Sequence, residues 1–240
     1  MNIVLFEPEE IAAPLPRTDP RAIHILEVLR RQKDDTFDAG LINGPRGKAT
    51  LVEISSTTLG LAFAWGEPTH PLPPITLLIG LPRPQTARKI LQEATALGVG
   101  ELHFVTTERG ETSYANSTLW TSGEWRRHLI AGTAQAFCTR LPKITHGRDI
   151  AGLLPNLPPD AMRIALDNYE ASTDLASALK GCAAKPVILA VGSERGWAPA
   201  ERTTFRENRF ALAHLGPRVL RTETAVVAAL AIVRSTLGWL

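Results

Sequence analysis

The chain has 240 residues, of which 44% are hydrophobic and 21% charged, and its formal net charge is +2. These values are ordinary for a folded globular protein and exclude a disordered or strongly polybasic chain. No apolar run reaches the roughly 18 residues that a membrane span needs, and the acidic N-terminus lacks the pattern of an export signal. We therefore expect a cytoplasmic protein. The two cysteines, Cys138 and Cys182, fit no metal or redox spacing and are expected to be reduced.

The first 70 residues predict a small β-barrel with one helix. Asp19 is a suitable helix N-cap and Pro20 suits the first helical position, so a helix is expected from there to about Arg30. Strands are predicted at 3–6, 36–42, 48–54 and 59–65. On the helix, the side chains predicted to be partly buried are Ile23, Leu26 and Val28.

A proline-rich stretch at 66–74 marks a domain boundary, because prolines at this density sustain neither a helix nor a central strand. From residue 71 onward strands and helices alternate. Strands are predicted at 75–79, 102–105, 163–166, 187–191 and 210–215, and helices at 87–97, 124–137, 175–179 and 222–237. This alternation predicts an α/β domain with a mostly parallel sheet covered by helices. The expected domains are therefore 1–70 and 71–240.

Ligands of parallel sheets bind at the carboxyl ends of the strands, so the loops that follow the strands are candidate sites. The loop at 192–197 reads Gly-Ser-Glu-Arg-Gly-Trp. Its glycines allow the backbone to approach a ligand, and Glu194 adds a carboxylate. The loop is neither a phosphate-binding loop nor a nucleophile elbow. An ordinary turn between a strand and a helix also accounts for it.

A second loop, at 215–225, carries Arg218, Arg221 and Glu223 directly before an apolar helix. Thr222 could be the helix N-cap, and Glu223 suits the positive end of the helix dipole. However, residues 225–233 contain no polar side chain, which is typical of a helix buried on all sides. Charges at an enclosed helix start need partners or a ligand, so this loop is predicted to be functional.

Two further groups of polar residues have plainer interpretations. Asp167 and Glu170 could form a metal or acid–base pair, but a solvated loop is the favoured reading. His24 and the arginines Arg30 and Arg31 could contact phosphate or form a solvated helix edge. The six histidines match no metal-binding spacing, so no metal is expected.

Several segments resemble the RsmE family of SPOUT-class RNA methyltransferases, which methylate N3 of a uridine in small-subunit (16S) ribosomal RNA. The matching segments are His24 to Arg30, the Ala-Thr-Ala-Leu-Gly-Val run at 94–99, Thr-Glu-Arg at 107–109, and the loop at 192–197. The stretch at 215–225 matches the family signature Leu-Gly-Pro-Arg-(Ile/Val)-Leu-Arg-Thr-Glu-Thr-Ala at every position. The resemblance covers nearly the whole chain.

The resemblance implies a PUA-like RNA-binding barrel at 1–70 and a SPOUT α/β domain at 71–240. It further implies a deep trefoil knot at about 187–240, S-adenosylmethionine as cofactor, and a homodimer whose site both chains complete. The implied partner is ribosomal RNA or the small ribosomal subunit, with no metal and no membrane involved. Such a knot would depart from the usual rule against threaded connections.

The family pattern also assigns roles by position. The residues implied to act in catalysis are Arg218, Arg221, Glu223 and Glu194. Those implied to bind the cofactor are Leu166, Gly192, Glu194, Gly196, Leu215, Gly216, Leu220 and Thr222. Those implied to bind RNA are His24, Arg30, Arg31, Arg83 and Arg109.

The chain departs from the family pattern at several positions. Ser193 and Arg195 stand where the family has Pro and Gly, and Ala96 replaces a Glu. The family's Glu-Gln-(Ser/Cys)-Gly-Arg segment appears at 134–138 as Ala-Gln-Ala-Phe-Cys, and its basic-aromatic start is replaced by Met-Asn-Ile. Two alternatives therefore stay open: a catalytically weak RNA-binding or ribosome-assembly protein on the same fold, and a SPOUT methyltransferase with a different RNA target.

Overall fold

The computed structural model describes residues 3–181 and 185–239, so Cys182 and the first two residues lie outside the described part. The chain forms two compact units. One comprises the residues up to Pro71 together with Thr133–Leu141, and the other comprises Leu72–Gly132 and the chain from Pro142 onward. Within the described residues, no helix is long and apolar enough to cross a membrane.

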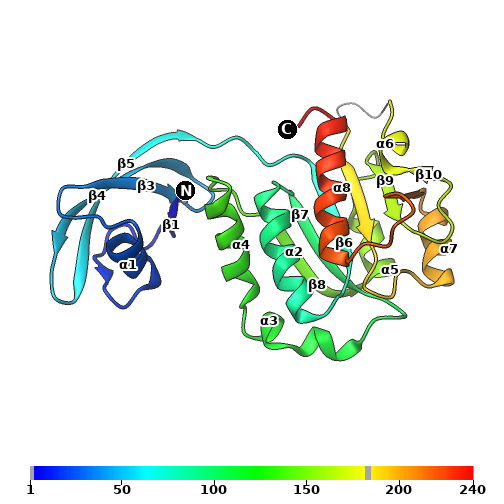
Figure 1. The fold of residues 1–240 in the computed structure, drawn as a ribbon, viewed down its shortest axis with the longest axis horizontal. Helices are drawn as coiled ribbons and strands as arrows, with labels where there is room; N and C mark the ends of the chain where they lie inside the picture. The colour runs from blue at the N-terminus through cyan, green and yellow to red at the C-terminus, as the bar shows by residue number, and fades with distance from the viewer. Residues whose placement is uncertain (1–2, 182–184, 240) are drawn as a thin grey trace. The chain divides into compact units, whose positions relative to one another are not determined.

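The first unit is a curled five-stranded sheet in the order β1-β3-β4-β5-β2 (Figure 1). Its strands are β1 (Val4–Phe6), β2 (Leu15–Pro16), β3 (Thr36–Leu41), β4 (Pro45–Ile54) and β5 (Thr58–Pro68). Strand β5 continues into the proline-rich stretch, as far as Pro68, where it pairs only with β4. Proline is tolerated there because no strand on the other side needs its missing N–H.

The helix of the first unit begins as predicted and then changes its winding. Asp19 caps α1 (Pro20–Ile23) by accepting a hydrogen bond from the Arg21 N–H, and a π-helical segment, His24–Val28, follows. The fully buried side chains of this segment are Ala22 and Ile25. Of the three side chains predicted to be partly buried, Leu26 is so, whereas Ile23 and Val28 are more exposed than predicted, at 43% and 65%.

The second unit is a seven-stranded parallel sheet in the order β10-β12-β9-β11-β6-β7-β8. The strands are β6 (Ile75–Gly80), β7 (Glu101–Thr106), β8 (Lys143–Asp149), β9 (Met162–Leu166), β10 (Thr173–Asp174), β11 (Val187–Val191) and β12 (Ala211–His214). The central strands β6 and β11 are buried at every position, as their predominantly apolar sequences predict. Sequence reasoning missed β8, because this edge strand is largely exposed and polar.

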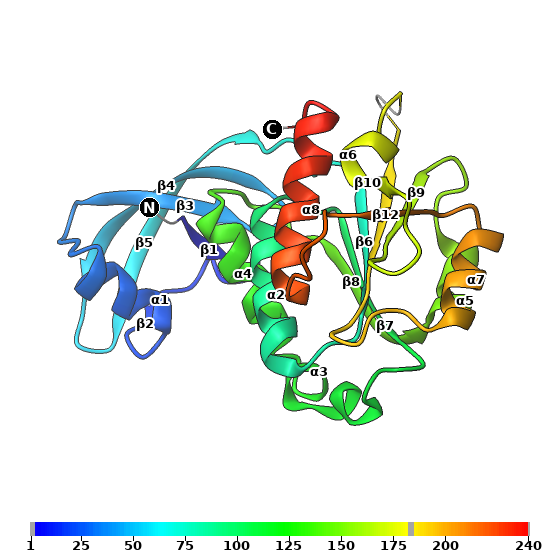
Figure 2. The same ribbon diagram turned by 45° about the vertical axis from the view of Figure 1, so that its right-hand side comes forward.

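Helices cover both faces of this sheet (Figure 2). Helices α2 (Pro84–Ala96) and α8 (Thr222–Thr236) pack side by side on one face. Helices α5 (Ile150–Leu153) and α7 (Pro199–Glu207) lie on the other, where their apolar side chains share a core with β6, β9 and β11. The remaining helices are α3 (Thr118–Thr121), α4 (Trp125–Gln135), α6 (Leu175–Ala178) and two 3₁₀ turns, Thr112–Asn116 and Leu154–Asn156.

The α/β fold class predicted from the sequence is confirmed, and the trefoil knot stays a prediction. Helix α8 differs from expectation in one respect. Val226, Leu230 and Val233 are buried, but Val227 and Ala231 are exposed. The prediction that α8 is buried on all sides is therefore wrong for the single chain, because only one side of the helix packs on the sheet and α2.

Candidate active site

A cavity of about 870 Å³ lies at the carboxyl edge of the parallel sheet, within the second unit. The loops that follow β9, β11 and β12 converge there with the first turns of α2 and α8. This is the edge where parallel sheets bind their ligands. The cavity brings together most of the residues that the sequence indicated: Arg83, Leu166, Gly192, Glu194, Gly196, Leu215, Arg218, Leu220, Arg221, Thr222 and Glu223.

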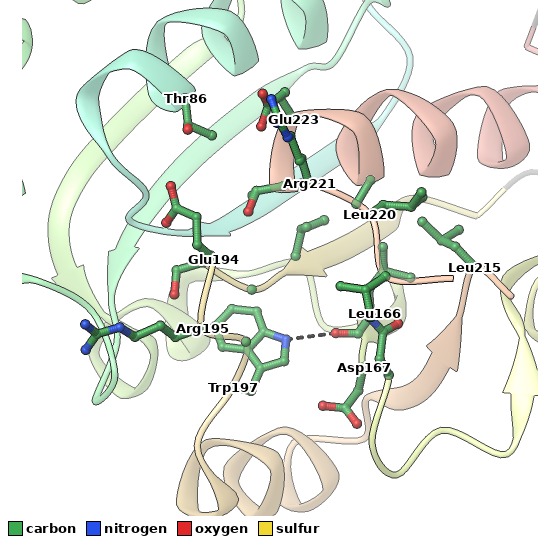
Figure 3. A pocket seen from close by; sticks show the side chains of 18 of the residues that line it. Thr86, Leu166, Asp167, Glu194, Arg195, Trp197, Leu215, Leu220, Arg221 and Glu223 are labelled. Carbon is green, nitrogen blue, oxygen red and sulfur yellow. Dashed lines mark hydrogen bonds between the residues drawn. The ribbon is translucent and has the colours of Figure 1, made fainter. Parts of the chain in front are cut away.

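The cavity has an apolar side and a charged side (Figure 3). Leu166, Leu215 and Leu220 gather on one side, whereas Glu194 and Glu223 lie on the other. Gly216 belongs to the same loop as Leu215 but is absent from the lining; its φ of 103° is one that glycine adopts readily. The arrangement suits a ligand with a flat apolar part and a charged part.

The loop after β11 is fixed by close packing. A side chain at Gly192 would come within 3.0 Å of the Gly196 Cα atom, and Gly196 itself has a φ of +63°. Trp197 is buried, and its indole N–H donates a hydrogen bond of 3.0 Å to the carbonyl oxygen of Leu166. The two glycines are thus required by the backbone path, and the tryptophan attaches the loop to the end of β9.

Glu194 lies at the N-terminal end of α2. One of its carboxylate oxygens accepts a hydrogen bond of 3.1 Å from the backbone N–H of Arg83, the N-cap residue of that helix. The helix dipole favours a negative charge at this position. Glu194 is exposed to the cavity, so its second oxygen remains accessible to a ligand.

Glu223 carries its charge at the start of α8, where Lys89 of α2 donates a hydrogen bond of 3.2 Å to it. The pKa of Glu223 lies below its usual value, chiefly because its carboxylate accepts a hydrogen bond from its own backbone N–H, with Lys89 contributing. The groups around the Glu223 carboxylate therefore favour its charged form. Thr222 is not the N-cap, since Arg221 occupies that position and Thr222 is the first helical residue.

The arginines of the loop at 215–225 are exposed. Arg218 and Arg221 line the cavity at its solvent-facing side. The inference that the start of α8 is enclosed is therefore wrong, although the charges do converge on a cavity. Their hydration means that they need no protein partner and remain free to meet an anionic ligand.

The loop after β9 is exposed at residues 168–170, as the expectation of a solvated loop predicts, but Asp167 itself is buried. It is 4% exposed, and one carboxylate oxygen accepts a hydrogen bond of 2.6 Å from Arg202, which is equally buried. Its other oxygen accepts hydrogen bonds from the backbone N–H groups of Tyr169 and Glu170. Asp167 thus holds its own loop in place, and the nearby Glu170 pairs with Arg202 at 3.5 Å.

The predicted RNA-binding residues fall in different places. Arg83 lines the cavity, and Arg109 donates a hydrogen bond to the backbone oxygen of Arg195, at 3.4 Å. His24, Arg30 and Arg31 belong to the first unit. Across the described residues, no group of three His, Cys, Asp or Glu side chains is placed to hold a metal ion.

Sequence reasoning missed the contribution of α2. Gln85, Thr86 and Lys89 line the cavity from its first turns, and Tyr169 lines it from the loop after β9. Helix α2 follows β6 after a short connection. Because ligands bind at the carboxyl ends of parallel strands, the segment after β6 was also a candidate site. The sequence shows no motif at these positions, so it did not predict that these residues line the cavity.

Comparison with known proteins identifies the family of the chain. Residues 68–234 match the model of a family described as an RNA methyltransferase domain. The chain is 39% identical to ribosomal RNA small subunit methyltransferase E of Treponema pallidum, over 97% of this chain and 90% of that protein. It is 29% identical to ribosomal RNA small subunit methyltransferase E 1 of Borreliella burgdorferi, over 99% of both chains.

Solved structures show the same fold. A probable rRNA methyltransferase from Porphyromonas gingivalis superposes with a TM-score of 0.81 at 21% identity, covering 99% of each chain. Ribosomal RNA small subunit methyltransferase E from Neisseria gonorrhoeae, solved bound to S-adenosylmethionine, has a TM-score of 0.72 at 22% identity, covering 97% of each chain. The chain belongs to the RsmE family of ribosomal RNA methyltransferases.

Proposed function

We propose that this protein transfers the methyl group of S-adenosylmethionine to N3 of a uridine in small-subunit (16S) ribosomal RNA. The observation that carries the proposal is that the complete signature loop at 215–225 and the glycine loop at 192–197 meet at one cavity. Membership of the family supplies the reaction class. The proposed substrate places the reaction in the cytoplasm, where ribosomal RNA is assembled into subunits.

The cavity fits S-adenosylmethionine. Its volume of about 870 Å³ lies in the upper part of the range for small-molecule sites, about 300–1,000 Å³. Leu166, Leu215 and Leu220 would hold the adenosine part, and the backbone at Gly192 allows close approach. The charged side would hold the methionine part. When bound, the cofactor supplies an electrophilic methyl group on a sulfonium sulfur.

The chain's own residues would manage the proton and charge of the uridine. N3 of uridine carries a proton, so methylation needs an acceptor for that proton and stabilisation of the base anion. Glu194 is the proposed acceptor, because its carboxylate is exposed at the cavity, whereas the carboxylate of Glu223 accepts a hydrogen bond from Lys89. Arg218 and Arg221 would stabilise the developing negative charge, and fixed loops would orient the reacting atoms.

We infer a homodimer from the exposed apolar side of α8. Val227 is 36% exposed and Ala231 is also exposed, on a helix that has no polar residue from 225 to 233. A second copy of the chain would remove this surface from water. For the first unit we propose a PUA-like RNA-binding role, in which the cationic His24-to-Arg31 segment contacts phosphate.

Calorimetric titration with S-adenosylmethionine, followed by methyl transfer to ribosomal subunits that lack the mark, tests the proposed function. We expect saturable cofactor binding and a new N3-methyluridine located by mass spectrometry. An absence of binding at millimolar cofactor would contradict the enzyme and favour an RNA-binding or assembly protein. Cofactor binding without restoration of that mark would indicate a different RNA target.

The variant Arg221→Ala separates the proposed roles within the site. If Arg221 acts on the RNA or the transition state, methyl transfer should fall far more than cofactor affinity. An equal loss of both would instead place Arg221 in cofactor binding. Leu220→Ala is the matched comparison, because this neighbouring residue lies on the apolar side and should weaken cofactor binding first.

A further inference from the structure

We propose that Tyr169 is a stacking platform for a base of the RNA substrate at the mouth of the cavity. The inference rests on the proposed function, whose cavity Tyr169 lines. Nothing in the sequence pattern indicated this residue, which follows β9 in a loop expected to be solvated. The structure shows instead a supported aromatic ring, with one face covered and the other open.

The backbone of Tyr169 is held rigidly. Asp167, which is 4% exposed, accepts hydrogen bonds from the N–H groups of Tyr169 and Glu170, at 2.8 and 2.7 Å. The two bonds fix the turn that presents the ring. A platform held in this way loses little conformational freedom when a ligand binds.

One face of the Tyr169 ring is covered by a buried cation. The guanidinium carbon of Arg202 lies 5.0 Å from the ring centroid, which is a cation–π distance. Arg202 is 4% exposed and is itself fixed by Asp167 at 2.6 Å and by Glu170 at 3.5 Å. The ring therefore rests on a support that cannot easily move.

The rest of the ring is open. Tyr169 is 74% exposed even though Arg202 covers one face, so most of this exposed area belongs to the opposite face and the ring edge. Ring atom Cε2 lies 3.7 Å from the position that a side chain on Gly196 would take. The ring therefore lies beside the glycine loop that contributes to the cavity.

The surroundings favour an RNA base over other occupants. The neighbouring side chains are polar or charged: Asn168, Arg195, and the ion pair of Glu170 with Arg206. Such surroundings do not suit an apolar protein interface, whereas a basic and aromatic surface suits single-stranded RNA. The partly buried leucines of the cavity would give the adenine of the cofactor a more enclosed place. An enzyme that acts on a base must also unstack it, and a stacking partner compensates for that loss.

The test compares Tyr169→Ala and Tyr169→Leu with Tyr169→Phe and Tyr169→Trp. Loss of the ring should lower kcat/KM for the RNA about 5- to 150-fold, corresponding to about 1–3 kcal/mol per stacked base. The dissociation constant of S-adenosylmethionine should not change. Phe and Trp should retain most of the activity, while Leu, which is apolar but has no planar ring, should behave like Ala.

Crosslinking identifies the base directly. RNA carrying 5-iodouridine at the modified position, or at its neighbours in turn, should crosslink to Tyr169 at one of these positions and not in Tyr169→Leu. Equal RNA kinetics for wild type and Tyr169→Ala would overturn the inference while leaving the proposed function intact. Weaker cofactor binding in Tyr169→Ala would assign the ring to adenine, and a changed oligomeric state would assign it to a protein interface. An inactive wild type would instead contradict the proposed function.

Discussion

The indole nitrogen of Trp197 donates a hydrogen bond of 3.0 Å to the carbonyl oxygen of Leu166, which joins the loop after β11 to the end of β9 (Figure 3). The ring is buried and packs edge-on against Phe205, at 4.8 Å between centroids. Two walls of the cavity are thereby held together by one side chain. Changes at Trp197 should consequently affect both stability and ligand binding.

The variant Trp197→Phe keeps an aromatic ring but removes the N–H donor. The free energy of unfolding should fall by about 1 kcal/mol or somewhat more, since a buried carbonyl loses its partner, and cofactor affinity should weaken. Urea denaturation and calorimetry measure the two effects. Trp120→Phe is the matched control, because the buried indole N–H of Trp120 has no partner among the described residues. An equal change of cofactor affinity in both variants would refute a specific role for the Trp197 bond.

The buried pair of Asp167 and Arg202 should be sensitive to the loss of one partner. Arg202→Met leaves the Asp167 carboxylate buried without its counter-ion, so the free energy of unfolding should drop by about 3–5 kcal/mol. Lys48→Met breaks the exposed pair with Asp38, whose lysine side chain is 58% exposed, and should cost at most about 1 kcal/mol. Similar losses in the two variants, measured by urea denaturation, would argue against a structural role for the buried pair.

His103 should make stability depend on pH. Burial is the main cause that lowers the pKa of His103 below the ordinary value of 6.5, while Glu101 opposes this shift. The unfolded chain therefore binds a proton that the folded chain resists, so this contribution to stability is present above pH 6.5 and declines as pH falls toward the folded pKa. Between pH 8 and pH 5 the free energy of unfolding should fall less in His103→Gln than in the wild type. The same pH dependence in wild type and variant would count against this assignment, and the exposed His70→Gln serves as control.

Arg195 stands where the family pattern has glycine, and it is exposed at the cavity. If it contacts an RNA phosphate, Arg195→Gly should weaken RNA binding and reduce the slope of log affinity against log salt by about 1. Affinity for S-adenosylmethionine should stay the same. Filter binding at several salt concentrations gives the slope, and an unchanged slope would mean that Arg195 makes no phosphate contact.

The exposed side of α8 makes the homodimer testable. Val227→Glu places a charge on this apolar surface, so the variant should sediment as a monomer at concentrations where the wild type is a dimer. Val52→Glu is the control, since Val52 is similarly exposed, at 41%, but lies in the first unit. A dimer that persists in Val227→Glu would exclude this side of α8 as the interface.

Features that depend on neighbouring residues could be predicted from the amino-acid sequence. Predominantly apolar runs predicted β6 and β11, and Asp19 with Pro20 predicted the start of α1. The loop at 215–225 identified the family because its signature is a continuous stretch. Each of these patterns lies within a continuous stretch of the chain, so it predicts a structure without knowledge of the fold.

Features that join distant segments of the chain could not be predicted, because they arise from packing in the folded protein. Asp167 and Arg202 are 35 positions apart, and no sequence pattern indicates that these two residues form an ion pair. Lys89 meets Glu223 because α2 and α8 pack together, and Tyr169 becomes a supported ring only because Arg202 lies beneath it. The exposure of one side of α8 likewise depends on which neighbours cover the other side. Burial and charge pairing are properties of packing, and packing is fixed only when the whole chain has folded.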